Sequence, residues 1–279
     1  TLSSSSAASD VYKRQLLIGI TIGSAIFATP QIIAGYAHSF TLIIILWLIV
    51  SVFVYIGSLI YAELGSRFPN TGGEYVYIRE AFGPFWGFIF GWAQLLIIRT
   101  SPAAGISLIT ANYLGYFIPM SQFEKIIASI IIIIIFGIIN YIGVEKASFY
   151  NKFSTLIKTS GIIIFTVAGL ATFEGGFLRL SETANVTENL GPIGNIVAAL
   201  MLILFSFLGW DRVGYIAGEM KNPQKVIPKT MLYGISSIAI IYISANILYH
   251  TVLGMDGVRS SSIVASDIST LLFGNLGAS

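Results

Sequence analysis

The chain alternates long apolar runs with short polar connections. Most of these runs reach or exceed the length of about 20 residues that an α-helix needs to cross a bilayer. They fall at residues 16–37, 40–62, 84–115, 126–142, 153–173, 193–217 and 230–253, and another begins near Ile263. The pattern therefore predicts an all-α integral membrane protein with seven membrane-spanning helices and the start of an eighth.

The two ends of the chain differ from the rest. Residues 1–15 are polar and rich in serine, lack an initiator Met and change abruptly to apolar sequence at Leu16. Their SAASDVYKRQ portion resembles translated adapter sequence, so we expect residues 1–15 to be a non-native or disordered leader and exclude them from the fold. The chain ends at Ser279 inside the eighth apolar run, which predicts that it is a fragment.

Composition excludes a soluble domain. Hydrophobic residues make up 55% of the chain and charged residues 10%, with a mean hydropathy of +0.83, whereas soluble domains carry about 25% charged residues. The net charge of +2 is too small to indicate a nucleic-acid partner. The absence of cysteine excludes a disulfide framework and a thiolate metal site, and no cofactor is expected. We expect both histidines, His38 and His250, at the membrane interface.

Basic residues in the connections predict the orientation, because cytoplasmic loops carry the excess of Lys and Arg. With the N-terminus inside, nine lie on the inner side and three on the outer side. The inner residues are Lys13, Arg14, Arg67, Arg79, Lys146, Lys152, Lys221, Lys225 and Lys229, and the outer ones are Lys125, Arg179 and Arg259. We therefore predict a multi-pass protein of the cell membrane with a cytoplasmic N-terminus.

The first apolar run carries small, weakly helix-forming residues at its centre, in GITIGSAIFATP from Gly19 to Pro30. A helix broken at membrane depth exposes backbone groups that lipid cannot satisfy, so the break must face protein, water or a ligand. A second half-helix starting near Ser24 would aim its amides at the gap, and the first half would end there in free carbonyls. These two ends suit the carboxylate and the ammonium of an amino acid. The alternative is an intact helix that uses Gly23, Ser24 and Ala25 for close packing.

The sixth apolar run is interrupted in a similar way at LFSFLGWD, from Leu204 to Asp211. Ser206 and Gly209 lie in mid-span, and Asp211 and Arg212 place charge where it is costly. Two broken spans that run in opposite directions are the pattern of an inverted-repeat transporter with its site at the midplane. The pair of breaks favours this interpretation over close packing.

Five motifs together resemble the L-type amino acid transporter branch of the amino acid–polyamine–organocation (APC) superfamily. They are GITIGSAIFATP, ELGSRFPNTGGEYVYIREAFG (Glu63 to Gly83), IIRTSP (Ile97 to Pro102), LFSFLGWD and AGEMKNPQKVIPK (Ala217 to Lys229). Among bacterial members of the family, these motifs most resemble those of the serine/threonine exchanger group. The resemblance implies a twelve-helix fold of two inverted five-helix repeats with discontinuous helices 1 and 6. Residues 16–173 would form the first repeat, and residues 193–279 would start the second.

The resemblance also implies a binding site made largely of backbone. The substrate carboxylate would meet the amides and the hydroxyl around Ser24, Ala25 and Ile26, and the amine would meet carbonyls of the two broken helices. The full set of expected substrate-binding residues is Thr21, Gly23, Ser24, Ala25, Ile26, Phe205, Ser206 and Leu208, with the amine at the carbonyls of Thr21, Phe205 and Leu208. Ala25 departs from the family, which usually has glycine there, and its methyl group narrows the pocket.

Aromatic residues at the second break are candidates for a gate. Phe207 and Trp210, together with Phe205, could occlude a pocket by rotating few torsions. The alternative is that these side chains only pack. The loop from Glu63 to Gly83 contains a turn cluster and a short amphipathic stretch, and we expect it to support or gate the site rather than to form it.

Three charged residues within the spans are expected to couple transport. Arg99 lies about fifteen residues into the third span and is predicted to pair with Asp211, the only deep carboxylate apparent from the sequence. Lys158 lies about six residues inside the fifth span. In the resembled family, members without sodium place a lysine ammonium there instead of the ion. For Arg99 and Lys158, the alternative is a side chain that extends to the nearest interface.

The sequence as a whole predicts a secondary active transporter of amino acids, either a sodium-independent exchanger or a proton-coupled carrier, that works by alternating access in the lipid bilayer. An enzyme would need clustered His, Cys, Asp or Glu at membrane depth, and a channel would show polar rings from symmetric subunits. A sensor of amino acids or amines on the same fold, without net transport, is the remaining alternative. Without cysteine, a disulfide-linked partner subunit is not expected.

Overall fold

The computed structural model describes residues 22–23, 25–68, 70–142, 144–172, 176–188, 190–212 and 222–274. The expected leader, residues 1–15, and the two expected site residues Thr21 and Ser24 lie outside this part of the chain. The described residues are helical almost throughout, which confirms the predicted all-α class.

The helices follow one another along the described parts of the chain. In chain order they are α2 (Ala25–Ala28), α3 (Pro30–Tyr36), α4 (Phe40–Arg67), α5 (Glu74–Phe82), α6 (Pro84–Ala93), the π-helix η1 (Gln94–Ile98), α7 (Thr100–Phe117), α8 (Gln122–Ile142), α9 (Val144–Thr172), the 3₁₀ helix η2 (Gly176–Ser181), α10 (Gly191–Ser206), α11 (Pro223–Ser260) and α12 (Val264–Phe273). Among the described residues, β pairing is limited to one isolated antiparallel bridge between Ser39 and Thr183.

Six helical stretches in the described part of the chain are long and apolar enough to cross a bilayer. They are Phe40–Arg67, Pro84–Gly115, Gln122–Ile142, Phe153–Ala171, Gly191–Arg212 and Gln224–Ser260. These stretches correspond to the second to seventh predicted spans. Most of the first predicted span before α2 lies outside the described residues, and α12 corresponds to the start of the eighth. The chain is therefore a multi-pass membrane protein.

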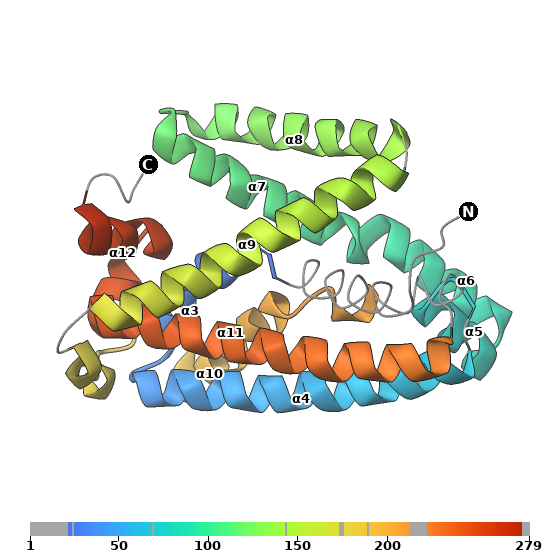
Figure 1. Ribbon diagram of the computed structural model, residues 1–279, viewed down its shortest axis with the longest axis horizontal. Helices are drawn as coiled ribbons and strands as arrows, with labels where there is room; N and C mark the ends of the chain where they lie inside the picture. The colour runs from blue at the N-terminus through green and yellow to red at the C-terminus, as the bar shows by residue number, and fades with distance from the viewer. Residues whose placement is uncertain are drawn as a thin grey trace.

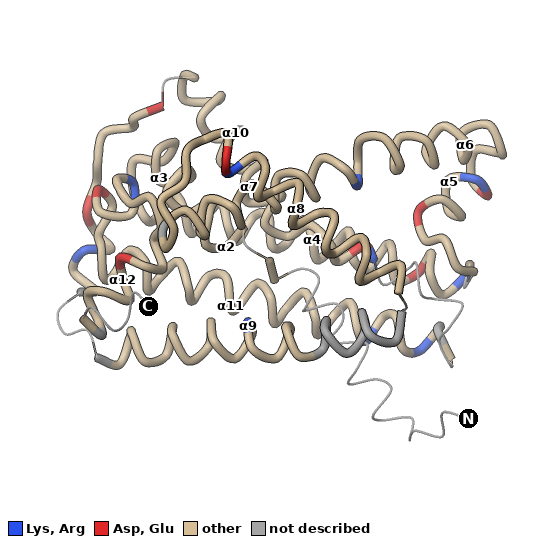
Figure 2. Tube along the Cα trace, turned by 90° about the horizontal axis from the view of Figure 1, so that it is seen from above, with Lys and Arg blue, Asp and Glu red and all other residues tan. Residues whose placement is uncertain are grey.

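Helices α4 and α11 lie side by side and antiparallel (Figure 1). Their facing sides bury Ile43, Trp47 and Tyr242 in the main hydrophobic core, to which α3 and α10 also contribute. Helices α7 and α8 lie apart from this pair, and α9 crosses towards the end of α11 (Figure 1). Figure 2 shows the charged residues of α4 and α11 near the helix ends, with long uncharged stretches between them. We call the end that holds the connection from α3 to α4 the α3–α4 end, and the opposite one the α4–α5 end.

Local sequence decides where several helices begin and bend. Ser39 accepts a hydrogen bond from the Leu42 amide at 3.3 Å and caps α4. Pro223 opens α11 at a position where its missing N–H is not needed. Gly254 interrupts α11 with φ 70° and ψ −179°, a conformation that favours glycine. The predicted seventh span, residues 230–253, ends at this kink, and one further helical stretch follows it.

The third span is one helix with a π-turn inside it. Helix α6, η1 and α7 follow one another from Pro84 to Phe117. The Arg99 amide bonds the Gln94 carbonyl, five residues earlier, at 3.1 Å. Wide turns of this kind frequently occur at functional sites, and this one has a polar side chain at each of its two ends.

His250 does not lie where the sequence placed it. The side chain is fully buried in α11, and its Nδ1 lies 2.9 Å from the Asn246 carbonyl. Its ring centroid lies 4.9 Å from that of Phe40. The expected interfacial position is wrong because α11 continues beyond this residue to Ser260 and keeps it in the packed core. His38, by contrast, is exposed between α3 and α4.

Candidate functional site

The first and sixth spans touch each other close to the two predicted interruptions. Helices α2 and α3 are separated by a bend at Thr29, whose amide bonds the Ala25 carbonyl at 2.9 Å. The Thr29 hydroxyl donates to the same carbonyl at 2.8 Å and lies 3.1 Å from the hydroxyl of Ser206, the last residue of α10. All three residues are buried. A pair of hydroxyl groups therefore connects the two interrupted spans.

Beyond Ser206, the hydrogen bonds of α10 give way to a tighter turn. The amides of Phe207 and Leu208 bond the carbonyls three residues earlier, each at 3.1 Å. Gly209 follows with φ 117°, a left-handed conformation that is strained for residues with a side chain. Residues 210–212 then form a short 3₁₀ turn. The motif LGWD thus ends the α-helix and turns the chain.

Tyr242 of α11 joins both interruptions, and the sequence alone did not identify it. Its side chain is fully buried, and its hydroxyl donates to the Ser206 carbonyl at 3.1 Å. It also forms a hydrogen bond with the backbone of Gly23. A buried tyrosine hydroxyl usually finds such partners. The sequence signal was a tyrosine within an apolar helix, which does not by itself distinguish a site from packing.

A cavity of about 290 Å³ opens beside the two interruptions. Most of the expected site residues line it, namely Gly23, Ala25, Phe205, Ser206, Leu208, Trp210, Arg99 and Asp211. Ile26, Phe207 and Lys158 do not line it. Thr21 and Ser24 lie outside the described residues. The structure therefore brings residues of both broken motifs into one cavity, together with four charged residues, Glu74, Arg99, Asp211 and Arg212.

The two aromatic residues proposed as a gate lie in different environments. Phe207 is fully buried, with its ring centroid 5.4 Å from that of Tyr242 and 5.9 Å from that of Trp47. This position corresponds to the packing alternative. Trp210 lines the cavity, and its ring centroid lies 4.8 Å from that of Tyr61. Of the two, Trp210 is the one whose side-chain rotation would change access to the cavity.

A charged network forms the wall of the cavity next to α5. Arg99 Nη2 lies 2.8 Å from Asp211 Oδ2 and 3.5 Å from Glu74 Oε2. The same Glu74 oxygen accepts a hydrogen bond from Gln94 Nε2 at 2.9 Å, and the other oxygen accepts one from the Tyr61 hydroxyl at 2.5 Å. One guanidinium group therefore stands between two carboxylates, and all three charged side chains are largely buried.

Arg99 contacts Asp211, as the sequence suggested, but Asp211 is not the only carboxylate at this depth. Glu74 also lines the cavity. From the sequence, Glu74 belonged to a supporting loop, whereas it is the first residue of α5, directly after the turn at Gly72 and Gly73. The expectation of a single deep carboxylate is therefore wrong. Nothing in the local sequence shows that α5 folds back onto the third span.

The π-turn of the third span aims two polar side chains at one carboxylate. Gln94 and Arg99 flank this turn and both contact Glu74. On a regular α-helix, residues three or four apart share a face, and residues five apart do not. The wider turn therefore produces a cluster that an uninterrupted α-helix would not form with these residues.

Lys158 lies apart from this cluster. It belongs to α9, its side chain is half-buried, and it does not line the cavity. The carbonyls that it was expected to meet begin at Gly19, outside the described residues. Its expected role in coupling therefore continues to rest on the family resemblance.

Comparison with known proteins identifies the family. The model of the amino acid permease family matches residues 15–279. The chain is 32% identical over 267 residues to the serine/threonine exchanger SteT of Bacillus subtilis (strain 168), covering 94% of this chain and 59% of that protein. It is 30% identical over 255 residues to the b(0,+)-type amino acid transporter 1 of Oryctolagus cuniculus, covering 90% and 52%. It is 29% identical over 269 residues to the cystine/glutamate transporter of Homo sapiens, covering 93% and 52%.

These matches bear on the predictions made from the sequence. They confirm the resemblance to L-type transporters of the APC superfamily and a transporter fold rather than an enzyme. The three relatives named are transporters or exchangers, so the alternative of a sensor gains no support. The chain spans little more than half the length of these relatives. Because the family model matches continuously from the first interruption to α12, the chain belongs to the amino acid permease family.

Proposed function

We propose that the complete protein is a secondary active transporter that exchanges amino acids across the cell membrane without sodium. The cavity carries this proposal, because its wall includes Gly23 and Ala25 from one interrupted span and Ser206 from the other. Interrupted helices form the substrate sites of several transporter folds, near the midplane of the bilayer. The names of the relatives support amino acids as the substrate class.

The two poles of the substrate have different binding partners in this proposal. The carboxylate binds at the start of the helical stretch 25–36, together with Ser24, where amides lack intrahelical partners and the helix dipole is positive. The amine binds near the end of α10, at the carbonyls of Phe205 and Leu208. Ile26, which is fully buried, contributes its amide rather than its side chain.

The charged network is proposed to open and close during alternating access. The ion pairs of Arg99 with Asp211 and Glu74 connect the third span, the turn after α10 and α5. If these elements separate, the cavity gains a path to the α4–α5 end. Trp210 lies beside the same path and is proposed to act as the aromatic part of this gate.

The orientation and the internal repeat remain proposals. Basic residues such as Arg67 and Arg79 support a cytoplasmic α4–α5 end and N-terminus, which puts the α3–α4 end outside the cell. The stretch 25–36 runs towards the α3–α4 end, and α10 runs away from it. Opposite directions are expected if residues 16–173 form the first repeat and an inverted second repeat begins at residue 193. The 279 residues contain no cysteine, so we propose that they form no disulfide bond with a partner subunit.

Lys158 is proposed to take the place that sodium occupies in sodium-coupled relatives of the fold. Its side chain is half-buried within the apolar stretch Phe153–Ala171, where a charged group requires a polar partner. An ammonium group here would hold carbonyls of the interrupted first span without an ion. A permanently charged lysine suits an exchanger, and a titrating lysine suits a proton-coupled carrier. We favour the exchanger.

The proposal is tested with the complete protein in proteoliposomes loaded with an unlabelled amino acid. Uptake of labelled amino acids, screened over all twenty, should require the internal amino acid and should persist when choline replaces sodium. A unitary current driven by voltage would indicate a channel, and binding without flux would indicate a sensor. Loss of uptake without sodium would refute the assignment of Lys158, and full activity of Lys158→Ala would refute a coupling role for it.

Two neighbouring substitutions test the position of the site. Ser24→Leu places a bulky side chain at the interruption and should abolish uptake while the protein still inserts into the membrane. Ala25→Gly is the matched control, because it removes only a methyl group from the cavity wall, and uptake should persist with an equal or broader substrate range. Normal uptake by a well-expressed Ser24→Leu variant would show that the substrate binds elsewhere.

A further inference from the structure

The C-terminal end of α3 is held by groups from distant parts of the chain. The last carbonyls of a helix have no partners within the helix. The Gly35 carbonyl accepts hydrogen bonds from the Thr187 amide at 3.1 Å and from the Thr187 hydroxyl at 3.3 Å. The His38 carbonyl, just beyond the helix, accepts from the Ala184 amide at 2.9 Å. The connection that precedes α10, residues 183–188, therefore runs along this end of α3.

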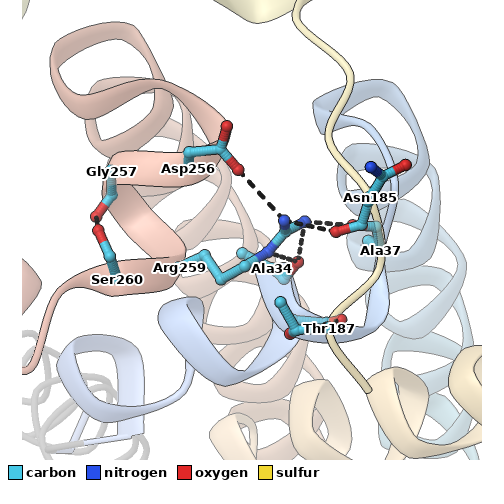
Figure 3. A network of polar contacts seen from close by, with 9 residues as sticks. Ala34, Ala37, Asn185, Thr187, Asp256, Gly257, Arg259 and Ser260 are labelled. Atoms are coloured by element: carbon cyan, nitrogen blue, oxygen red, sulfur yellow. Dashed lines mark hydrogen bonds and ion pairs between the residues drawn. The ribbon is translucent and has the colours of Figure 1, made fainter. Parts of the chain in front are cut away.

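Arg259, in the last turn of α11, provides the remaining contacts (Figure 3). Its Nε and Nη2 donate to the Ala34 carbonyl at 3.1 Å and 3.0 Å, and Nη2 also donates to the Ala37 carbonyl at 3.3 Å. Its Nη1 donates to the Asn185 carbonyl at 2.6 Å. All three nitrogens of the planar guanidinium group are therefore used, on two separate segments. We call these contacts of Arg259 with the three carbonyls the carbonyl clamp.

Asp256 contacts Arg259 from the solvent side, outside the clamp. Its Oδ1 lies 3.2 Å from Arg259 Nη1, and its side chain is 85% exposed, whereas that of Arg259 is 11% exposed. An exposed ion pair of this kind contributes little to stability. The contacts with the Ala34 and Ala37 carbonyls are partly buried and charge-assisted, so we expect them to dominate. Asp256 is therefore a suitable control position.

The kink at Gly254 lies just before the turn of α11 that carries Arg259. The carboxylate of Glu182 occupies the space where a side chain at residue 254 would begin, with its Oε2 2.5 Å from the ideal Cβ position. Just before the kink, the Val252 carbonyl accepts a hydrogen bond from Arg179 of η2. The kink, η2 and the connection before α10 therefore form one packed unit, and Arg259 extends it to α3.

Helix α3 connects the clamp to the cavity. The Ile33 amide bonds the Thr29 carbonyl at 2.9 Å, and the Thr29 amide bonds the Ala25 carbonyl at 2.9 Å. Hydrogen bonds therefore continue from the clamped end to Ala25 in the cavity wall. A shift of α3 relative to α11 would move Ala25 as well.

We propose that Arg259 is a positioning residue for amino acid exchange. The carbonyl clamp holds α2 and α3, the end of α11 and residues 183–188 as one body, and so keeps the cavity face of the first span in its binding orientation. The effect of the clamp on substrate affinity rests on the proposed function. The contacts that form the clamp do not depend on that function. Without the clamp, α2 and α3 sample further orientations. The apparent affinity for the amino acid then falls in proportion to the population of the orientation that can bind it.

The kinetic test compares three variants of the complete protein in proteoliposome exchange. Arg259→Ala should raise KM about tenfold, since it removes several charge-assisted hydrogen bonds, and should change the maximal rate by less than about twofold. Arg259→Lys retains the charge but cannot reach both segments, so it should show most of this rise. Asp256→Asn leaves the clamp intact and should keep KM within about twofold of the parent value. An unchanged KM in Arg259→Ala, or full rescue by lysine, would overturn the proposal.

A distance measurement tests the clamp without transport. Spin labels at His38→Cys and Ser260→Cys, both exposed, lie on the two sides of the clamp, and the 279 residues contain no other cysteine. In the complete protein, freed of cysteines elsewhere, the distance distribution should be narrow with and without substrate and should broaden in Arg259→Lys. A distribution that shifts with substrate in the parent, or stays narrow in the variant, would refute the clamp. Absence of exchange by the parent would refute the proposed function, and the distances would still decide on the clamp.

Discussion

Arg99 and Arg259 show two ways of burying a guanidinium group in one membrane protein. At the cavity wall, Arg99 Nη2 faces two carboxylates, Asp211 at 2.8 Å and Glu74 at 3.5 Å. At the α3–α4 end, Arg259 uses all three nitrogens to face backbone carbonyls. The first environment requires a positive charge, and the second requires the planar fork of arginine.

The difference indicates which part of the molecule changes during transport. The carboxylates at the cavity wall come from α5 and from the turn after α10, and ion pairs between such elements tolerate changes in geometry. The carbonyls at the α3–α4 end belong to a helix terminus and a connection that are fixed by their own hydrogen bonds. We therefore expect the cavity wall to rearrange and the α3–α4 end to stay constant.

Removal of the charge at the cavity wall should have the largest effect. Arg99→Leu leaves the carboxylates of Asp211 and Glu74 close together without their cation. Loss of one partner of a buried ion pair costs about 3–5 kcal/mol, and we expect about 3 kcal/mol because these groups retain some exposure. The thermal unfolding midpoint of the complete protein in detergent measures this loss.

The control for this prediction is a double-mutant cycle. Asp211→Asn in the Arg99→Leu background should recover part of the lost stability, because it removes one of the two negative charges that Arg99 faced. A coupling energy below about 0.5 kcal/mol would show that Arg99 and Asp211 do not act as a pair.

Lysine substitutions give the next largest effect and test the comparison directly. Arg99→Lys should retain more than half of the stability that Arg99→Leu loses, because an ammonium group also places a positive charge between the two carboxylates. Arg259→Lys should lose about 1.5–3 kcal/mol, because lysine cannot donate to both segments of the clamp. Unfolding midpoints of the two variants measure this contrast, and equal losses at both positions would remove the distinction between the two arginines.

The loss of one hydroxyl between the two interruptions should have a moderate effect. Tyr242→Phe keeps the ring packing with Trp47 but removes the donor to the Ser206 carbonyl and the partner of the Gly23 backbone. We expect a loss of about 1–3 kcal/mol and a higher KM for exchange. Phe207→Leu, next to it in the core, is the packing control and should lower stability with a smaller change in KM. If Tyr242→Phe leaves both quantities unchanged, its bridging role is wrong.

An exposed ion pair at the α4–α5 end should have the smallest effect. Arg67 Nη2 lies 2.5 Å from Glu63 Oε1, and the two side chains are 68% and 62% exposed. Arg67→Ala should change the free energy of unfolding by no more than about 0.5 kcal/mol. Denaturation of the same preparation measures it, and a loss comparable to that of Arg99→Leu would show that burial does not explain the importance of the cavity network.

Features that depend on local sequence were predictable. The length of each apolar run indicated the spans, and the turn at Gly209 followed from the sequence LGWD. The contacts of Glu74, Tyr242 and Arg259 were not predictable, because each depends on how distant helices approach one another. The burial of His250 was missed for a related reason, since the apolar run gave no indication of how far α11 extends.

Phe207 and Trp210 illustrate the limit of motif-based assignment. They lie three residues apart and carry the same type of side chain, so the sequence offered both as gates. In the structure, one is buried in the core and the other lines the cavity. The turn through Gly209 lies between them, so the regular spacing of an α-helix does not decide where the two side chains point.

The carbonyl clamp also has a consequence for the order in which the protein is made. The residues that it joins, Ala34 and Arg259, lie 225 positions apart in the chain. A ribosome that adds about 5–20 residues per second needs roughly 10–45 s to synthesise that stretch. During this time, the Ala34 and Ala37 carbonyls lack the hydrogen bonds that Arg259 donates. The first span is thus among the earliest to be synthesised but reaches its final position only after α11 has emerged.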